Sequence, residues 1–207
     1  MMEGGIIAAD LKPGIVPLST NEARGARRAK AVCSIADIFL YQQRGFIDYG
    51  MVGGSQIDKY GNLNTSIIGT VDKPRARLPG GGGGNDIMSS ASRLIITMSH
   101  EKRRFVEKVD FITSPGYLSG ADSRERAGLM FGGPSIVVTN LAILGFDSHS
   151  KRMRVDALHS GVSLEDVLKN TGFELIVPKD IRVIEPPTVE ELRFLKEIDP
   201  RKEMLGH

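Results

Sequence analysis

The chain carries near its middle the segment Leu78-Pro79-Gly80-Gly81-Gly82-Gly83-Gly84-Asn85-Asp86-Ile87-Met88-Ser89-Ser90, in which five glycines stand in a row. Glycine loses more backbone entropy on folding than any other residue, so such a run is unfavourable in ordinary structure. It fits a loop whose backbone turns with positive φ or approaches a ligand closely, and whose peptide N–H groups hold an anion. A flexible linker is the alternative, but the run is short, lacks Ser and Thr, and leads to the apolar run Leu94-Ile95-Ile96-Thr97-Met98. We therefore expect a ligand-binding loop ahead of a buried strand.

Length and composition indicate a globular protein. The 207 residues are 41% hydrophobic and 25% charged, which is ordinary for a globular chain. The formal net charge is +2 with both signs interspersed, so nucleic acid is not expected as a partner. A single cysteine, Cys33, excludes an internal disulfide framework and suits a reducing compartment, and no apolar run reaches the roughly 18 residues of a membrane helix. These features predict a cytoplasmic protein with no membrane partner.

The rest of the chain alternates strands with short helices. Strand-like segments at residues 46–54 and 93–98 end in glycine or polar residues, and residues 134–147 have hairpin character. Residues 34–43 predict a helix with Ser34 as its N-cap, a further helix is expected to start at Asp86, and Gly61 and Asn62 suit positive φ in a turn. Residues 163–172 predict a helix that is capped by Ser163 and Asp166, and a final amphipathic helix is expected from about Thr188 to Glu197. We therefore expect an α/β fold, an open and mostly parallel sheet flanked by helices, in a single domain over residues 1–207 with a helical tail at 186–207.

Few side chains stand out as catalytic from the residues alone. Glu3 lies between apolar residues and a Gly-Gly pair, where a strand would enter a turn. A carboxylate in that place serves as a nucleophile or general base, or is simply a frayed terminal acid. His100 follows the predicted strand and suits a structural role as well as a catalytic one. No ligand-like spacing connects the remaining histidines and the cysteine, so no metal site is expected at His149, His159, His207 or Cys33.

Several segments together resemble the β subunits of family I CoA-transferases, those of glutaconate and 3-oxoacid CoA-transferases among them. They are residues 53–64 (GGSQIDKYGNLN), 80–90 (GGGGGNDIMSS), 98–105 (MSHEKRRF) and 165–175 (EDVLKNTGFEL). The likeness runs in order from about Glu3 to Pro200, which makes it more specific than any one motif. It implies an open α/β sheet of the CoA-transferase architecture, a partner α subunit, and coenzyme A as a substrate with no permanently bound cofactor.

The resemblance also implies covalent catalysis by a glutamate in a Glu-Asn/Ser-Gly context. Glu3-Gly4-Gly5 matches this position, with Gly4 in place of the usual Asn or Ser. The glutamate attacks an acyl-CoA, CoA thiolate opens the resulting anhydride, and the glutamyl-CoA thioester then passes CoA to an acceptor carboxylate. Backbone N–H groups would stabilise the oxyanions formed on the way. The resemblance places the CoA and acyl site at Gly82, Gly83, Gly84 and Asn85, and the substrate pocket at Gly53, Gly54 and Gln56, with Asp58 either in this pocket or anchoring its turn.

Several alternatives stay open beside this interpretation. Family members carry a longer lead before the glutamate, and only Met1-Met2 precede Glu3 here, so an N-terminal strand and helix are expected to be missing. A CoA-thioester or ring-opening hydrolase on the same scaffold, a non-catalytic CoA-binding subunit, and a sugar-phosphate-binding domain are the other function classes. A dicarboxylic substrate, CoA phosphates or plain surface charge would each account for the arginines at 75, 77, 103 and 104.

Overall fold

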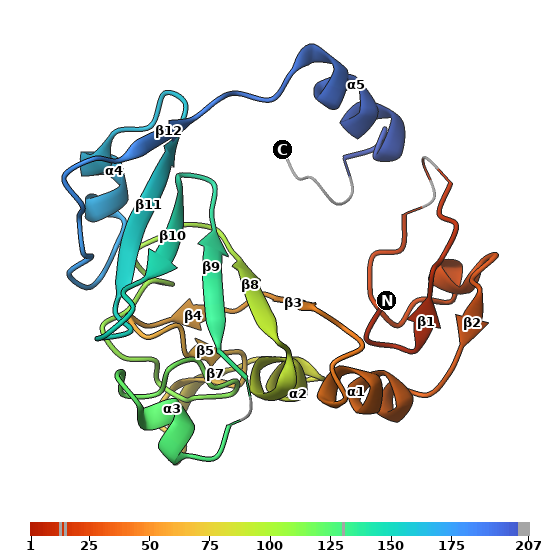
Figure 1. Ribbon diagram of the computed structural model, residues 1–207, viewed down its shortest axis with the longest axis horizontal. Helices are drawn as coiled ribbons and strands as arrows, with labels where there is room; N and C mark the ends of the chain where they lie inside the picture. The colour runs from red at the N-terminus through yellow and green to blue at the C-terminus, as the bar shows by residue number, and fades with distance from the viewer. Residues whose placement is uncertain (13, 15, 130, 203–207) are drawn as a thin grey trace. The chain divides into compact units, whose positions relative to one another are not determined.

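The computed structural model describes residues 1–202 except 13, 15 and 130. The chain divides into two compact units (Figure 1). Unit 1 combines Met1–Arg44 with the segment that begins at Pro186, and unit 2 is Gly45–Glu185. The helical tail expected at the C-terminal end therefore belongs to unit 1. None of the described helices is long and apolar enough to cross a bilayer.

Unit 2 is built on a six-stranded sheet with the strand order β12-β11-β10-β9-β8-β3 (Figure 1). Its strands are β3 (Tyr49–Val52), β8 (Arg93–Thr97), β9 (Pro134–Val138), β10 (Ala142–Phe146), β11 (Met153–His159) and β12 (Arg182–Ile184). The pairs β3 with β8, β8 with β9, and β11 with β12 are parallel, whereas β10 is antiparallel to both of its neighbours. The expected open, mostly parallel sheet is confirmed, and so is the hairpin at residues 134–147.

The described residues of unit 2 also form three short helices and a buried apolar core. The helices are α2 (Gly84–Ser90), α3 (Ser123–Arg126) and α4 (Leu164–Lys169), and α4 starts with the expected capping box. Helix α2 begins at Gly84 instead of the predicted Asp86, because Gly83 takes the N-cap position. It lies against β3 where Gly50 has no side chain, since a Cβ there would stand 2.5 Å from Cγ2 of Ile87. The fully buried core includes Ile57, Leu63, Met88, Leu94, Ile96, Phe105, Val137, Leu144, Val155 and Val167.

Two small hairpins lie between β3 and α2 in the chain. β4 (Gln56–Ile57) pairs with β5 (Leu63–Asn64), and β6 (Ile67–Gly69) pairs with β7 (Pro74–Arg77), both antiparallel. The turn of the first hairpin contains Gly61 with φ +72°, as the sequence predicts. The backbone of Gly61 lies so close to Gly116 that a Cβ on Gly116 would stand 2.4 Å from its carbonyl carbon. The first hairpin is thereby tied to the segment that follows residue 114.

Unit 1 contains short elements in its described residues. β1 (Ile6–Ile7) pairs antiparallel with β2 (Ala31–Val32), η1 (Ala23–Ala26) is a single 3-10 turn, and the two α-helices are α1 (Ile35–Gln43) and α5 (Val189–Ile198). Both helices begin with capping boxes, which local hydrogen bonding favours. The predicted N-cap Ser34 and the predicted final helix are confirmed. The N–H of Gly14 donates to the carbonyl of Ile198 at 2.9 Å, which joins the two segments of the unit.

Candidate active site

Polar segments follow three adjacent parallel strands at their carboxyl ends. β3 leads to Gly53-Gly54, β8 to residues 98–100, and β9 to Thr139-Asn140. These ends meet, because Oδ1 of Asn140 accepts the N–H of His100 at 2.7 Å and a Cβ on Gly53 would lie 3.2 Å from the last carbonyl oxygen of β8. Ligands of open α/β sheets bind at this edge. The structure therefore places Gly53 and Gly54 at the edge expected for a site.

A cavity of ≈ 510 Å³ opens within unit 2 close to this edge. Its volume is in the range of small-molecule sites. The lining includes the predicted Gln56, whereas Gly53 and Gly54 only lead to it along the chain. Sequence reasoning missed Ser55 and Leu78, although both stand beside glycine motifs that it singled out. The full lining is Ser55, Gln56, Ile68, Arg75, Leu78, Arg103 and Arg104.

Gln56 is held at the cavity wall by a network of buried amides. Its Oε1 accepts from Nδ2 of Asn64 at 2.7 Å and from the N–H of Asp110 at 3.1 Å. Its Nε2 donates to Oδ2 of Asp110 at 3.2 Å, and the same carboxylate oxygen accepts the N–H of Gly69 at 2.8 Å. Such fully connected polar groups hold a buried side chain in one orientation. Gln56 therefore shapes the wall and links the two small hairpins.

Asp58 anchors the turn of the first hairpin. Its Oδ1 accepts the N–H groups of Tyr60 and Asn62, and Nδ2 of Asn62 bonds both carboxylate oxygens. Burial raises the pKa of the Asp58 carboxyl, and these hydrogen bonds oppose the rise. Oδ1 of Asn62 in turn accepts the N–H groups of Gly116 and Leu118. Of the two roles that the sequence left open for Asp58, the structure supports the anchor.

The glycine run forms a loop in which two residues take backbone conformations that favour glycine. Gly80 has φ +100° and Gly82 has φ +49°. The N–H of Gly80 donates to the carbonyl of Thr65 at 2.8 Å, and that of Gly84 donates to the carbonyl of Gly81 at 2.7 Å. Among the described residues, the N–H groups of Gly81 and Gly82 have no acceptor. The positive φ expected for this loop is confirmed, and the loop presents peptide N–H groups that are not used by its own fold.

The segment around Thr113 contacts the glycine loop and the start of α2. Nδ2 of Asn85 donates to the carbonyl of Thr113 at 2.9 Å. A Cβ on Gly81 would lie 3.2 Å from Cγ2 of Thr113, and a Cβ on Gly84 would lie 3.2 Å from Oγ of Ser114. The resemblance places Asn85 in the CoA and acyl site, and its amide is engaged in holding the loop.

Glu3 lies in unit 1, in a turn that leads into β1. The turn is closed by the N–H of Gly5, which donates to the carbonyl of Met2 at 3.1 Å. The carboxylate is partly exposed, and its Oε2 accepts from Oγ1 of Thr20 at 3.4 Å. The sequence suggested the end of a strand at this point, but Glu3 precedes the strand, because the Gly4-Gly5 pair turns the chain before Ile6.

Both glycines after Glu3 are required by close approach of other backbone. A Cβ on Gly4 would lie 2.3 Å from Oδ1 of Asn21 and 2.6 Å from the carbonyl oxygen of Thr20. Gly5 has φ +99°, and a Cβ there would lie 1.9 Å from the carbonyl oxygen of Cys33. The departure from Asn or Ser at position 4 therefore has a steric reason in this chain.

His100 is buried at the end of β8 as a neutral side chain. Oγ1 of Thr139 lies 3.1 Å from Nδ1 of His100. The same hydroxyl accepts the backbone N–H groups of residues 141 and 142 and donates to the carbonyl of residue 142 at 2.9 Å. Nε2 of the ring lies 2.9 Å from Oγ1 of Thr171, which donates to the carbonyl of Val167. Burial lowers the pKa of His100 to about 4, and the ring stacks on Phe105 at 4.1 Å, so its role here is structural.

This buried histidine predicts a pH-dependent stability. Between pH 6.5 and about 4, His100 is protonated in the unfolded chain but neutral in the folded protein. The free energy of unfolding therefore falls as the pH drops through this window. Below about pH 4, the free energy of unfolding should be about 3 kcal/mol lower than at neutral pH because of this one group. Urea unfolding at several pH values should show a shallower pH slope for His100→Asn. His149→Asn, an exposed histidine, is the control, and an equal slope change in both variants would contradict the prediction.

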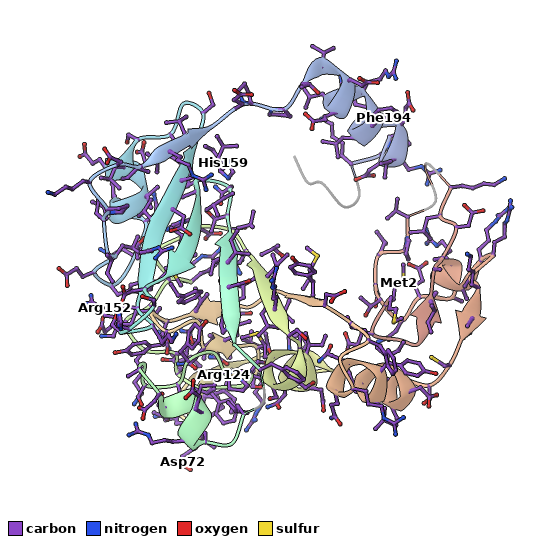
Figure 2. All side chains as sticks on the ribbon, viewed as in Figure 1. Met2, Asp72, Arg124, Arg152, His159 and Phe194 are labelled. Atoms are coloured by element: carbon purple, nitrogen blue, oxygen red, sulfur yellow. The ribbon has the colours of Figure 1, made fainter. Side chains whose placement is uncertain are left out.

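Arg124 is a buried charged residue that sequence reasoning overlooked. Only 3% of it is exposed, and its guanidinium donates to backbone carbonyls of Pro115, Gly116 and Met88 at 3.0, 2.8 and 2.7 Å. It belongs to α3, and Figure 2 labels it in the lower part of the view. Burial lowers its pKa, with Tyr117 opposing the shift. Because Met88 lies in the last turn of α2, Arg124 fixes the end of the helix that begins at the glycine loop.

The described residues contain no group of three or more His, Cys, Asp or Glu side chains that could hold a metal ion. His149 is exposed, and Nε2 of His159 lies 2.8 Å from the carbonyl oxygen of Thr139. His207 is outside the described residues.

Comparison with known proteins identifies the family of this chain. The family model for coenzyme A transferase matches residues 24–170. The chain is 38% identical over 200 residues to the B-type subunit of 3-oxoadipate CoA-transferase from Pseudomonas knackmussii, covering 96% of this chain and 76% of that protein. It is 48% identical over 151 residues to the B-type subunit of glutaconate CoA-transferase from Acidaminococcus fermentans, covering 72% of this chain and 56% of that protein.

A solved structure agrees with these sequence relationships. The crystal structure of glutaconate coenzyme A-transferase from Acidaminococcus fermentans superposes with a TM-score of 0.88 at 37% identity, covering 97% of this chain and 78% of that chain. The similarity thus extends over both units and reaches well beyond the region of the family model. The chain belongs to the coenzyme A transferase family, and within it to the β, or B-type, subunits.

Proposed function

We propose that this chain moves coenzyme A between an acyl-CoA and a carboxylic acid, with Glu3 as the covalent carrier and an A-type subunit as its partner. The observation that carries the proposal is the 38% identity over 96% of the chain to the B-type subunit of a CoA-transferase. Glutaconate and 3-oxoadipate, which name two relatives, are both dicarboxylic acids. We extend that substrate class to this chain.

The proposed chemistry uses the carboxylate of Glu3 as a nucleophile. It attacks the thioester carbonyl of the acyl-CoA, which gives a mixed anhydride and free CoA thiolate. The thiolate attacks the glutamyl carbonyl, releases the acyl group as its carboxylate, and leaves CoA on Glu3 as a thioester. The acceptor carboxylate then attacks this thioester, and the thiolate finally takes the acceptor acyl group from the second anhydride. Glu3 returns as a free carboxylate, so no proton or electron is left over.

Each of these attacks places negative charge on a carbonyl oxygen. We propose peptide N–H groups of the glycine loop as the donors to this oxyanion. Gly82 is supported by an N–H without an acceptor in the described part of the chain, and Gly81 joins it on the same ground. Gly84 is less suited than the sequence suggested, because its N–H already donates to Gly81. Gly83 remains a candidate from the resemblance.

The test is to trap CoA on the chain. The full chain, co-expressed with an A-type subunit, is mixed with acyl-CoA and then with borohydride, which reduces a glutamyl thioester to a primary alcohol. Peptide mass mapping should locate the alcohol at Glu3, whose turn fixes the carboxylate beside Thr20. Consumption of acyl-CoA without any reduced glutamate would contradict the proposal and favour direct hydrolysis.

A further inference from the structure

We infer that the cavity lined by Arg75, Arg103 and Arg104 recognises the second carboxylate of a dicarboxylic acid substrate. This inference rests on the proposed function, because it assigns the part of the acid that does not exchange CoA. The cavity lies wholly within unit 2, so the argument uses only contacts inside that unit.

The cavity carries an excess of positive charge. Three of its lining residues are arginines. A single carboxylate, that of Glu101, meets two of them: Oε2 lies 2.5 Å from Nε of Arg103, and Oε1 lies 3.2 Å from Nε of Arg104. One carboxylate cannot balance three guanidinium groups, so the lining keeps a net positive charge. It therefore favours an anion.

The guanidinium groups keep donors that the fold does not use. The carboxylate of Glu101 meets the Nε atoms of Arg103 and Arg104, and the terminal nitrogens of both arginines have no acceptor among the described residues. Arg75 has neither an ion pair nor a side-chain hydrogen bond to any described residue. Arginine presents a planar pair of N–H groups that matches the two oxygens of a carboxylate. Arg104 is the best placed for this pairing, because its side chain is only 30% exposed and its charge is less screened than that of Arg103.

The remaining lining fits a short hydrocarbon chain. Ile68 and Leu78 form an apolar part of the cavity wall. Gln56 is held in one orientation by its hydrogen bonds to Asp110 and Asn64, and it limits the width of the cavity. CoA phosphates are the other source of oxyanions in this reaction. An apolar wall offers nothing to a diphosphate, whereas the methylene groups of a dicarboxylic acid gain from contact with it. The lining thus favours the carboxylate over the phosphate.

The experiment measures binding to the full chain by calorimetry with three probes: glutarate, pentanoate and inorganic pyrophosphate. Wild type should bind glutarate more tightly than pentanoate, which has the same chain length and one carboxylate fewer. Arg75→Gln and Arg104→Gln should each weaken glutarate binding roughly tenfold and leave pentanoate binding unchanged. Arg77→Gln is the matched control, because it removes the same charge from the same strand but from a residue outside the lining.

A loss of stability in the variants can be told apart from a loss of glutarate binding. Arg75 has no side-chain hydrogen bond or ion pair in the described chain, so its replacement removes none. A thermal melt checks both variants, including Arg104→Gln, which loses its pairing with Glu101. Pyrophosphate binding that depends on Arg75 while glutarate binding does not would overturn the inference and identify a phosphate site. Equal effects of Arg75→Gln and Arg77→Gln would overturn it as well.

The outcome is separable from that of the borohydride experiment. A thioester trapped at Glu3, together with glutarate binding that is insensitive to Arg75 and Arg104, would leave the proposed function standing and refute the inference. Glutarate binding that depends on these arginines, without any thioester at Glu3, would support the carboxylate site and refute the covalent carrier.

Discussion

Replacing Glu3 by Gln is expected to lower the rate of CoA transfer by about 10⁴-fold or more, because the amide keeps the size of the side chain but is no nucleophile. The amide oxygen still accepts from Oγ1 of Thr20, and the turn through Gly4 and Gly5 is unchanged. The loss should therefore appear in kcat, and a urea unfolding curve of the variant separates it from any change in stability. A transfer assay of the chain with its co-expressed partner measures it.

Asp10→Asn is the matched control for this variant. Asp10 is an exposed carboxylate of the same unit, and it pairs with Arg28 at 3.1 Å on the surface. Surface ion pairs of this kind contribute little to stability. If Glu3→Gln kept the rate of Asp10→Asn, Glu3 would not be the carrier, and a hydrolase or a non-catalytic binding subunit would account better for the chain.

The second large effect is expected for Arg124→Met, which should reduce the free energy of unfolding by about 3–5 kcal/mol. Methionine fills much of the same volume, yet it donates no hydrogen bond. The carbonyls of Pro115, Gly116 and Met88 would lose a buried donor, and each buried acceptor left without one is unfavourable. Urea unfolding measured by circular dichroism would show the change.

Arg126→Met provides the comparison on the same short helix. Arg126 is exposed and pairs with Asp122 at 3.2 Å, so its loss should change the free energy of unfolding by about 0.5 kcal/mol or less. Arg124→Lys should fall between the two, because one ammonium reaches fewer carbonyls than a guanidinium. Equal stability of Arg124→Met and Arg126→Met would show that the buried hydrogen bonds do not contribute as argued.

Features with a local cause were predictable from the sequence. Helix starts at Ser34 and Ser163 depend on side chains three residues apart, and strands β3, β8, β9 and β10 follow from apolar runs between turn residues. The glycine run likewise predicts positive φ angles, because few residues other than glycine adopt them. These parts of the fold needed no knowledge of distant contacts.

Features that depend on tertiary contact were not predictable. Nothing in Ser123-Arg124-Glu125-Arg126 distinguishes the buried arginine from the exposed one, because only packing decides which side chain faces the carbonyls. Likewise, the sequence left Arg75 and Arg77 equivalent, and the fold brings only Arg75 to the cavity with Arg103 and Arg104. The resemblance identified Asn85 as a site residue, but the structure uses its amide on a carbonyl far along the chain.

Helix α2 is anchored at both of its ends, by Asn85 on Thr113 and by Arg124 on Met88. The glycine loop is therefore followed by a helix that is held in place at both ends. The conformational freedom of the loop is confined to the few residues before this helix. The entropy of ordering this segment is lost when the protein folds, so little of it has to be lost again when a ligand arrives. In the reaction that we propose, such preorganisation would let peptide dipoles face the developing charge without reorganising, which is the condition under which they lower a barrier most.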